Sequence, residues 1–161
     1  LNSPVVGLSK SVDSIREAVV FLGLSQIKRW SMLITLSSQR SSNPELLKAL
    51  LIRAKCCELL AAKSNGVCLE QAFTVGMVSG MDQLLQISRQ ELLSQVTLSD
   101  ELKGAILQFK GPLGKILYSA MSIEEERWDK ISKLPIKIRS YVNEVFFDAL
   151  EWANKITAAL K

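Results

Sequence analysis

Apolar residues recur along this chain at helical spacing in one segment after another, and no segment shows the sustained alternation of a β-strand. Residues 37–43 are polar and predict an exposed loop. The remaining pattern predicts helices over residues 12–22 (capped by Ser11, ended by Gly23), 26–36 (capped by Ser25), 45–63, 69–85, 88–95, a helix opening at 98–101 with Ser99 as its cap, 113–121, and 135–161. We therefore expect an all-α fold, a single compact multi-helix bundle formed by one domain over residues 1–161.

The segment 135–161 is predicted to be the longest helix and carries the widest apolar face. Its apolar residues repeat at alternating spacings of four and three: Ile138, Val142, Val145, Ala149, Trp152 and Ile156. A face of this width indicates packing into the core, with a dimer or interdomain surface as the alternative.

The segments 45–63 and 69–85 form the predicted centre of the bundle. The second contains several small residues, and two of them, Gly76 and Gly80, lie inside an apolar helix. Because Gly in a helix costs about 1 kcal/mol relative to Ala, two such residues need a reason. Close approach of a neighbouring helix is the usual one. We interpret 69–85 as a central packing helix, with a ligand-lining role as the alternative.

Composition supports helices packed on one another. The chain has 161 residues, of which 48% are hydrophobic, with only 8 Gly and 4 Pro. Its net charge of +4 permits an acidic partner without identifying one, and the dense basic stripe of nucleic-acid-binding proteins is missing. We expect no membrane span and no signal peptide. The first ten residues look like a cut inside a longer protein, of which this chain is then the C-terminal part.

Three cysteines, Cys56, Cys57 and Cys68, are present, and two of them are adjacent. Adjacent residues on a helix point about 100° apart, so this pair is poorly placed to share one metal. We interpret all three as reduced core or boundary residues of a cytoplasmic protein, against a redox or metal role.

The chain contains no histidine, which removes the common imidazole-based catalytic and zinc sites. No Gly-rich phosphate loop is present, and KGPLGK, residues 110–115, is interpreted as a turn between helices. Carboxylates that remain as candidates for catalysis occupy predicted caps or polar faces: Asp82, Glu91, Asp100 and Glu101. We expect no catalytic residue, no metal site and no cofactor.

Three stretches carry a resemblance to a known family. These are LLIRAKCCELLAAK followed by AFTVGMVSGMDQLL (residues 50–63 and 72–85), SVDSIREAVVFLGLSQIKRW (11–30) and VTLSDELKGAIL (96–107). Together they resemble the HDOD domains, relatives of the HD phosphohydrolases in bacterial signalling proteins. They are most similar to the subgroup attached behind an EAL domain in cyclic-di-GMP signalling.

The resemblance implies a degenerate metal site. The His-Asp pair of catalytic HD proteins falls on Ser79 and Gly80, and Asp82 has no histidine beside it. The resemblance thus implies a non-enzymatic regulatory or interaction module in the cytoplasm of a bacterium. Its partner would be an EAL domain in the same full-length protein or in another signalling protein, and a homodimer stays open. The alternative is a degenerate HD-type phosphohydrolase that retains nucleotide or small-ligand binding.

Overall fold

The computed structural model describes residues 44–95, 98–126, 128–134 and 136–159. The helices predicted over 12–22 and 26–36 and the loop over 37–43 lie outside these residues. Within them every regular element is a helix and no strand occurs, so the predicted all-α class is confirmed. The helices are α4 (Pro44–Ala62), α5 (Leu69–Leu85), α6 (Arg89–Gln95), α7 (Asp100–Gln108), α8 (Gly111–Glu124), α9 (Trp128–Ile131), α10 (Ile136–Arg139) and α11 (Val142–Ala159). None of these described helices is long and apolar enough to cross a membrane.

Packing divides the chain into two units. The first comprises residues 1–47 and 81–98, and its described part contains α6 and the adjoining ends of α4 and α5. The second comprises residues 48–80 and 99–161 and contains most of α4 and α5 together with α7 to α11. The prediction of one domain over residues 1–161 stays a prediction.

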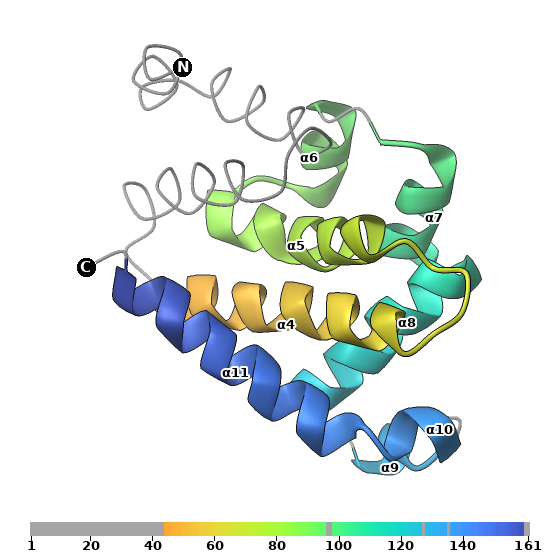
Figure 1. The fold of residues 1–161 in the computed structure, drawn as a ribbon. Helices are drawn as coiled ribbons and strands as arrows, with labels where there is room; N and C mark the ends of the chain where they lie inside the picture. Colours follow the sequence, from red (N-terminus) through yellow and green to blue (C-terminus); the bar gives the residue numbers. More distant parts are fainter. Residues whose placement is uncertain (1–43, 96–97, 127, 135, 160–161) are drawn as a thin grey trace. The chain divides into compact units, whose positions relative to one another are not determined.

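In the second unit α4 runs between α5 and α11 (Figure 1). Phe73 of α5 meets Trp152 of α11 edge to face, with 5.8 Å between ring centroids. Lys55 of α4 places its ammonium 5.4 Å from the centroid of the same indole. Leu50, Ala54, Cys57 and Ala61 form a buried face of α4. The largest fully buried side chains of this unit include Leu51, Val75, Val78, Leu117 and Val145. The core of the unit therefore lies where α4, α5, α8 and α11 face one another.

Most helix boundaries follow the local signals. The hydroxyl of Ser99 accepts the N–H of Leu102 at 3.3 Å and so caps α7 as predicted. The hydroxyl of Ser88 accepts the N–H of Glu91 at 3.1 Å and caps α6 in the same way. The prediction that KGPLGK, residues 110–115, is a turn holds only at its first residue, because α7 ends at Gln108 and α8 begins at Gly111, so residues 111–115 form the start of α8.

The single helix predicted over 135–161 is wrong. The described residues form the short α10 and then α11, and α4 with 19 residues is longer than α11 with 18. At the break the hydroxyl of Ser140 donates to the carbonyl of Lys137 at 2.8 Å, and the N–H of Tyr141 donates to the carbonyl of Ile138 at 3.0 Å. The N–H of Tyr141 thus bonds three residues back instead of four, which interrupts the regular helical ladder at this position, while the hydroxyl of Ser140 bonds within its own turn.

Candidate functional site

The degenerate His-Asp position lies in the tight contact between α5 and α4. A Cβ atom placed on Gly76 would be 2.7 Å from the Cα of Ala54. A Cβ atom placed on Gly80 would be 2.8 Å from Cδ1 of Leu50 and 3.0 Å from Nη1 of Arg53. Both glycines thus permit the helices to approach closely, which confirms the packing interpretation of this face.

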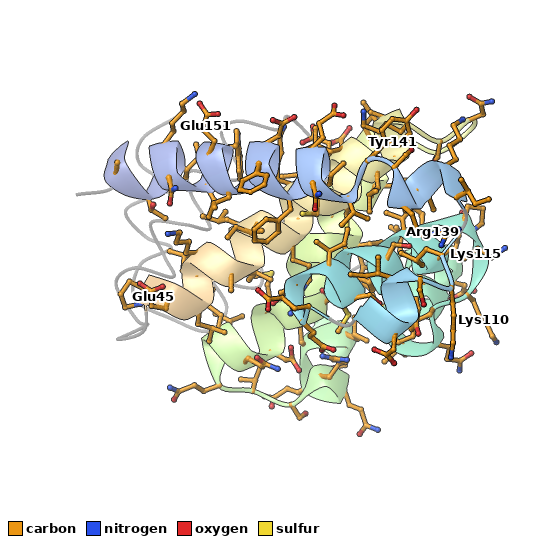
Figure 2. The ribbon with its side chains drawn as sticks, turned by 90° about the horizontal axis from the view of Figure 1, so that it is seen from below. Glu45, Lys110, Lys115, Arg139, Tyr141 and Glu151 are labelled. Carbon is orange, nitrogen blue, oxygen red and sulfur yellow. The ribbon has the colours of Figure 1, made fainter. Side chains whose placement is uncertain are left out.

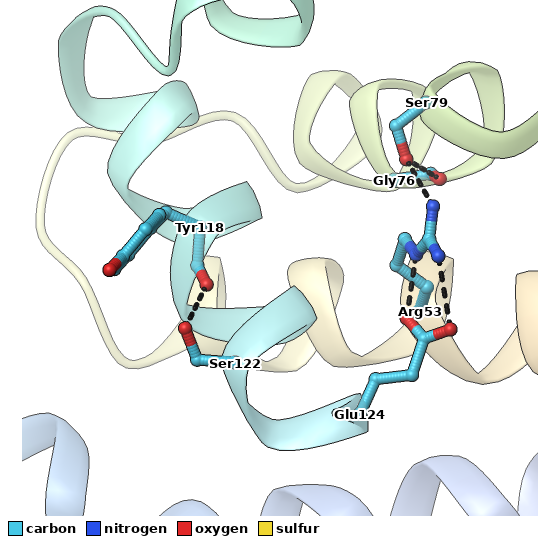
Figure 3. A network of polar contacts seen from close by, with 6 residues as sticks. All are labelled: Arg53, Gly76, Ser79, Tyr118, Ser122 and Glu124. Atoms are coloured by element: carbon cyan, nitrogen blue, oxygen red, sulfur yellow. Dashed lines mark hydrogen bonds and ion pairs between the residues drawn. The ribbon is translucent and has the colours of Figure 1, made fainter. Parts of the chain in front are cut away.

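Arg53 of α4 fills the space beside this position (Figure 3). Its Nε and Nη2 atoms donate to the two carboxylate oxygens of Glu124, at 2.7 and 3.0 Å. Its Nη1 atom donates to the hydroxyl of Ser79 at 3.2 Å, and that hydroxyl donates in turn to the carbonyl of Gly76 at 2.7 Å. We call Arg53, Ser79 and Glu124 the arginine cluster. It joins α4, α5 and the end of α8.

The arginine cluster is largely withdrawn from water. The side chains of Arg53 and Glu124 are 14% and 24% exposed, and Ser79 is buried. Burial alone would lower the pKa of Arg53, but the hydrogen bonds and the negative charge of Glu124 outweigh it, so the pKa is raised. The guanidinium therefore stays charged at every physiological pH. Arg53 and Glu124 therefore form a largely buried ion pair beside Ser79.

The comparisons with known proteins match residues 1–103 to the HDOD domain. The chain belongs to the HDOD family. The matched residues include Ser79 and Gly80. The resemblance to the HDOD domains that the sequence predicted is thus confirmed. No solved structure matches the chain.

Two curated relatives extend the likeness beyond residue 103. The uncharacterized protein YuxH of Bacillus subtilis is 33% identical over 164 aligned positions, covering 99% of this chain and 40% of YuxH. The cyclic di-GMP phosphodiesterase CdgJ of Vibrio cholerae is 31% identical over 154 positions, covering 92% of this chain and 36% of CdgJ. The chain thus spans about two fifths of the length of these relatives, and it is related to proteins of cyclic-di-GMP signalling.

The cysteines of this HDOD domain do not gather into a site. Cys56 and Cys57 are buried and Cys68 is exposed, and all three are free thiols. Burial, followed by the charge of Glu124, raises the pKa of Cys56 to about 12, and burial also raises the pKa of Cys57. Thiols held neutral in this way are poor nucleophiles and poor metal ligands.

The four candidate carboxylates lie in the first turns of helices or in an ion pair. Asp100 and Glu101 lie in the exposed first turn of α7, and Glu91 in the first turn of α6. Asp82 pairs with Arg89 through a 3.3 Å contact. Among the described residues no three or more His, Cys, Asp or Glu side chains come together in a way that could hold a metal ion.

At Gly76 and Gly80, α5 is in close contact with α4, which leaves no room for a ligand at these two positions. A pocket of about 200 Å³ does occur in the second unit, between the end of α4 and residues 137–141, and neither Ser79 nor Gly80 lines it. Its walls come from Leu60, Lys63, Ser64, Lys137, Ile138 and Tyr141.

Sequence reasoning identified Ser79 but missed Arg53, which donates to it, and Glu124, which pairs with Arg53. Arg53 and Glu124 are 71 positions apart, so no local motif joins them. One signal was available: Arg53 is a charge on a helix whose neighbouring positions, Leu51 and Ala54, face the core. A buried charge needs a partner.

Proposed function

We propose that this HDOD domain is a non-enzymatic regulatory module of a bacterial cyclic-di-GMP signalling protein and acts in the cytoplasm by contact with an EAL domain. Family membership and the likeness to CdgJ, named a cyclic di-GMP phosphodiesterase, support the signalling context. The partner domain would lie in the same full-length protein or in another one.

The observation that carries the non-enzymatic part is the arginine cluster. Metal-dependent hydrolysis of the HD kind needs imidazole and carboxylate ligands that hold a cation and lower the pKa of its water. At the matching place Ser79 offers one neutral hydroxyl, which already donates to Gly76 and accepts from Arg53, and Gly80 offers no side chain. The guanidinium group, 3.2 Å from this hydroxyl, also occupies space that a metal ion beside Ser79 would need.

Hydrolysis assays of the domain test this part. The purified domain is expected to release neither phosphate nor linear dinucleotide from mono- and cyclic-nucleotide substrates with Mn²⁺ or Mg²⁺. The Ser79→His and Gly80→Asp double variant is expected to stay inactive as well, because the chain has no other histidine and Arg53 keeps its charge. Metal-dependent turnover by the wild-type domain above a heat-killed control would overturn the proposal.

A deletion in the parent protein tests the regulatory part. Removing residues 1–161 is expected to change the rate of cyclic-di-GMP hydrolysis without abolishing it, since the catalytic machinery would belong to the partner domain. An unchanged rate at low and saturating substrate would contradict a regulatory role. A thermal-shift panel of nucleotides checks the alternative of a retained ligand site, which predicts a rise in melting temperature with one of them.

A further inference from the structure

Three large apolar side chains are exposed in α7, α8 and the turn between them. Leu107, Phe109 and Tyr118 are 49%, 39% and 36% exposed. Phe109 and Tyr118 meet edge to face, with ring centroids 5.6 Å apart and planes at 81°. Exposed aromatic side chains that gather on one face of a folded protein mark sites of interaction more often than scattered ones do.

Phe109 is held in a backbone conformation that disfavours it. Its φ of 53° and ψ of 32° lie in the left-handed region, where glycine or asparagine usually ends a helix. The other described non-glycine residues with positive φ, Gln86 and Glu126, are polar and lose nothing by facing water. An aromatic residue at such a position is unfavourable in two ways: its side chain strains the left-handed backbone, and its ring is partly exposed to water.

The surrounding backbone fixes this conformation. The N–H of Phe109 donates to the carbonyl of Ala105 at 3.1 Å, and the N–H of Lys110 donates to the carbonyl of Gly104 at 3.2 Å. A Cβ atom on Gly114 would lie 2.1 Å from the carbonyl carbon of Phe109, so only glycine lets α8 pack against this peptide. Phe109 is therefore held rigidly outward, which lowers the entropy lost when a partner binds it.

Lysines lie close to Phe109 and Tyr118 in the sequence. Between residues 102 and 122 the chain contains three lysines and no Asp or Glu. Lys110 and Lys115 are exposed, and Figure 2 shows both at the α8 end of the second unit. An apolar centre with a basic rim fits a protein surface that has an apolar depression with a carboxylate rim.

We propose that Leu107, Phe109, Lys110, Lys115 and Tyr118, the corner surface, dock this domain onto an acidic-rimmed face of the cyclic-di-GMP phosphodiesterase domain in the same polypeptide. This rests on the function proposed above. The basic rim supplies the complementarity, and CdgJ, named a phosphodiesterase, extends over a further three fifths of its length beyond the matched part. In this proposal Phe109 inserts into the apolar depression of the partner domain, and the positive charge of Lys115 orients the two domains as they approach.

Two substitutions in the parent protein test the corner surface. Phe109→Gly removes the anchor and supplies a residue that adopts positive φ freely, so the melting temperature should be equal or higher. Its rate of cyclic-di-GMP hydrolysis should shift to that of the protein lacking residues 1–161. Lys115→Glu should shift the rate in the same direction, and more at low ionic strength. Phe147→Ala is the matched control because Phe147 is an exposed aromatic residue on α11, and it should leave the rate unchanged.

Photo-crosslinking identifies the occupant. A benzophenone side chain at position 109, but not at 147, should form a cross-link within one polypeptide to a segment outside residues 1–161 that contains Asp or Glu. A cross-link to a second copy of this domain, or none above the level at position 147, would overturn the proposal. If deletion of residues 1–161 leaves hydrolysis unchanged, the proposed function fails. If the deletion matters but Phe109→Gly does not, the corner surface alone fails.

Discussion

The contact between α4 and α5 lets us predict how two alanine substitutions, Gly76→Ala and Gly80→Ala, change the stability of the fold. At Gly76 the new methyl group would be 2.7 Å from the Cα of Ala54 and 3.1 Å from the carbonyl oxygen of Arg53, both backbone atoms. At Gly80 it would meet only the ends of flexible side chains, Leu50 at 2.8 Å and Arg53 at 3.0 Å. Side-chain ends can turn away, whereas backbone contacts are relieved only if the helices separate.

The magnitudes follow from three effects. Gly→Ala gains about 1 kcal/mol in helix propensity at either position. The entropy of the unfolded chain changes by the same amount for both variants. Overpacking at Gly76 costs about 1–3 kcal/mol, because relief there would pull apart fully buried residues such as Val75 and Ala54. We expect Gly80→Ala to be neutral or stabilising and Gly76→Ala to be less stable than Gly80→Ala by about 1–3 kcal/mol.

Urea unfolding followed by circular dichroism at 222 nm measures this difference directly. Since both variants carry the same substitution in one helix, their unfolding midpoints can be compared at a common m-value. For a chain of 161 residues the difference corresponds to roughly 2–4 °C in melting temperature per kcal/mol. Equal stability of the two variants, or a lower stability of Gly80→Ala, would refute the reasoning that backbone proximity decides the outcome.

Three further predictions concern other parts of the fold. Arg53→Met is expected to cost about 2–4 kcal/mol by leaving Glu124 unpaired, and adding Glu124→Leu should recover most of it; additive losses in a double-mutant cycle would contradict this. Iodoacetamide should label Cys68 in the folded protein and spare Cys56. The pKa of Cys56 is raised from 9.0 to about 12 by folding. The stability that the neutral buried thiol contributes should therefore be complete below pH 9 and should be lost as the pH rises toward 12, because the unfolded chain releases the proton first. A urea midpoint that stays constant over this range would count against this prediction. Ser99→Ala should cost about 1 kcal/mol by removing the cap of α7, whereas an unchanged midpoint would show that water replaces it.

Helix bounds were predictable where the sequence interrupts its own pattern. Asn65 and Gly66 end the α4 segment, and Ser99 opens α7, because caps and breakers act over a few residues. The break at Ser140 gave no such signal. The apolar period continues from Ile138 into α11, and a serine that bonds back to its own turn cannot be told from a solvent-facing one by its position.

Only part of the candidate site could be predicted from the sequence, for a related reason. Ser79 and Gly80 were found because a family pattern is local in sequence, and the tightness of Gly76 followed from the apolar character of its helix. The pairing of Arg53 with Glu124 depends on how α4 and α8 meet in three dimensions, which a helical period does not encode. Likewise, the left-handed backbone of Phe109 goes with a close approach of α8 that Gly114 permits five residues later, and no local preference of phenylalanine predicts it.

The ion pair of Arg53 has a consequence for exchanging modules between proteins. The family match ends at residue 103, but the carboxylate that neutralises Arg53 comes from Glu124. A chimera that transplants residues 1–103 alone would carry a guanidinium into an apolar contact without its counter-charge. The transplanted segment must therefore include α8. A chimera whose boundary lies after Glu124 should fold, whereas a chimera whose boundary lies at residue 103 should not.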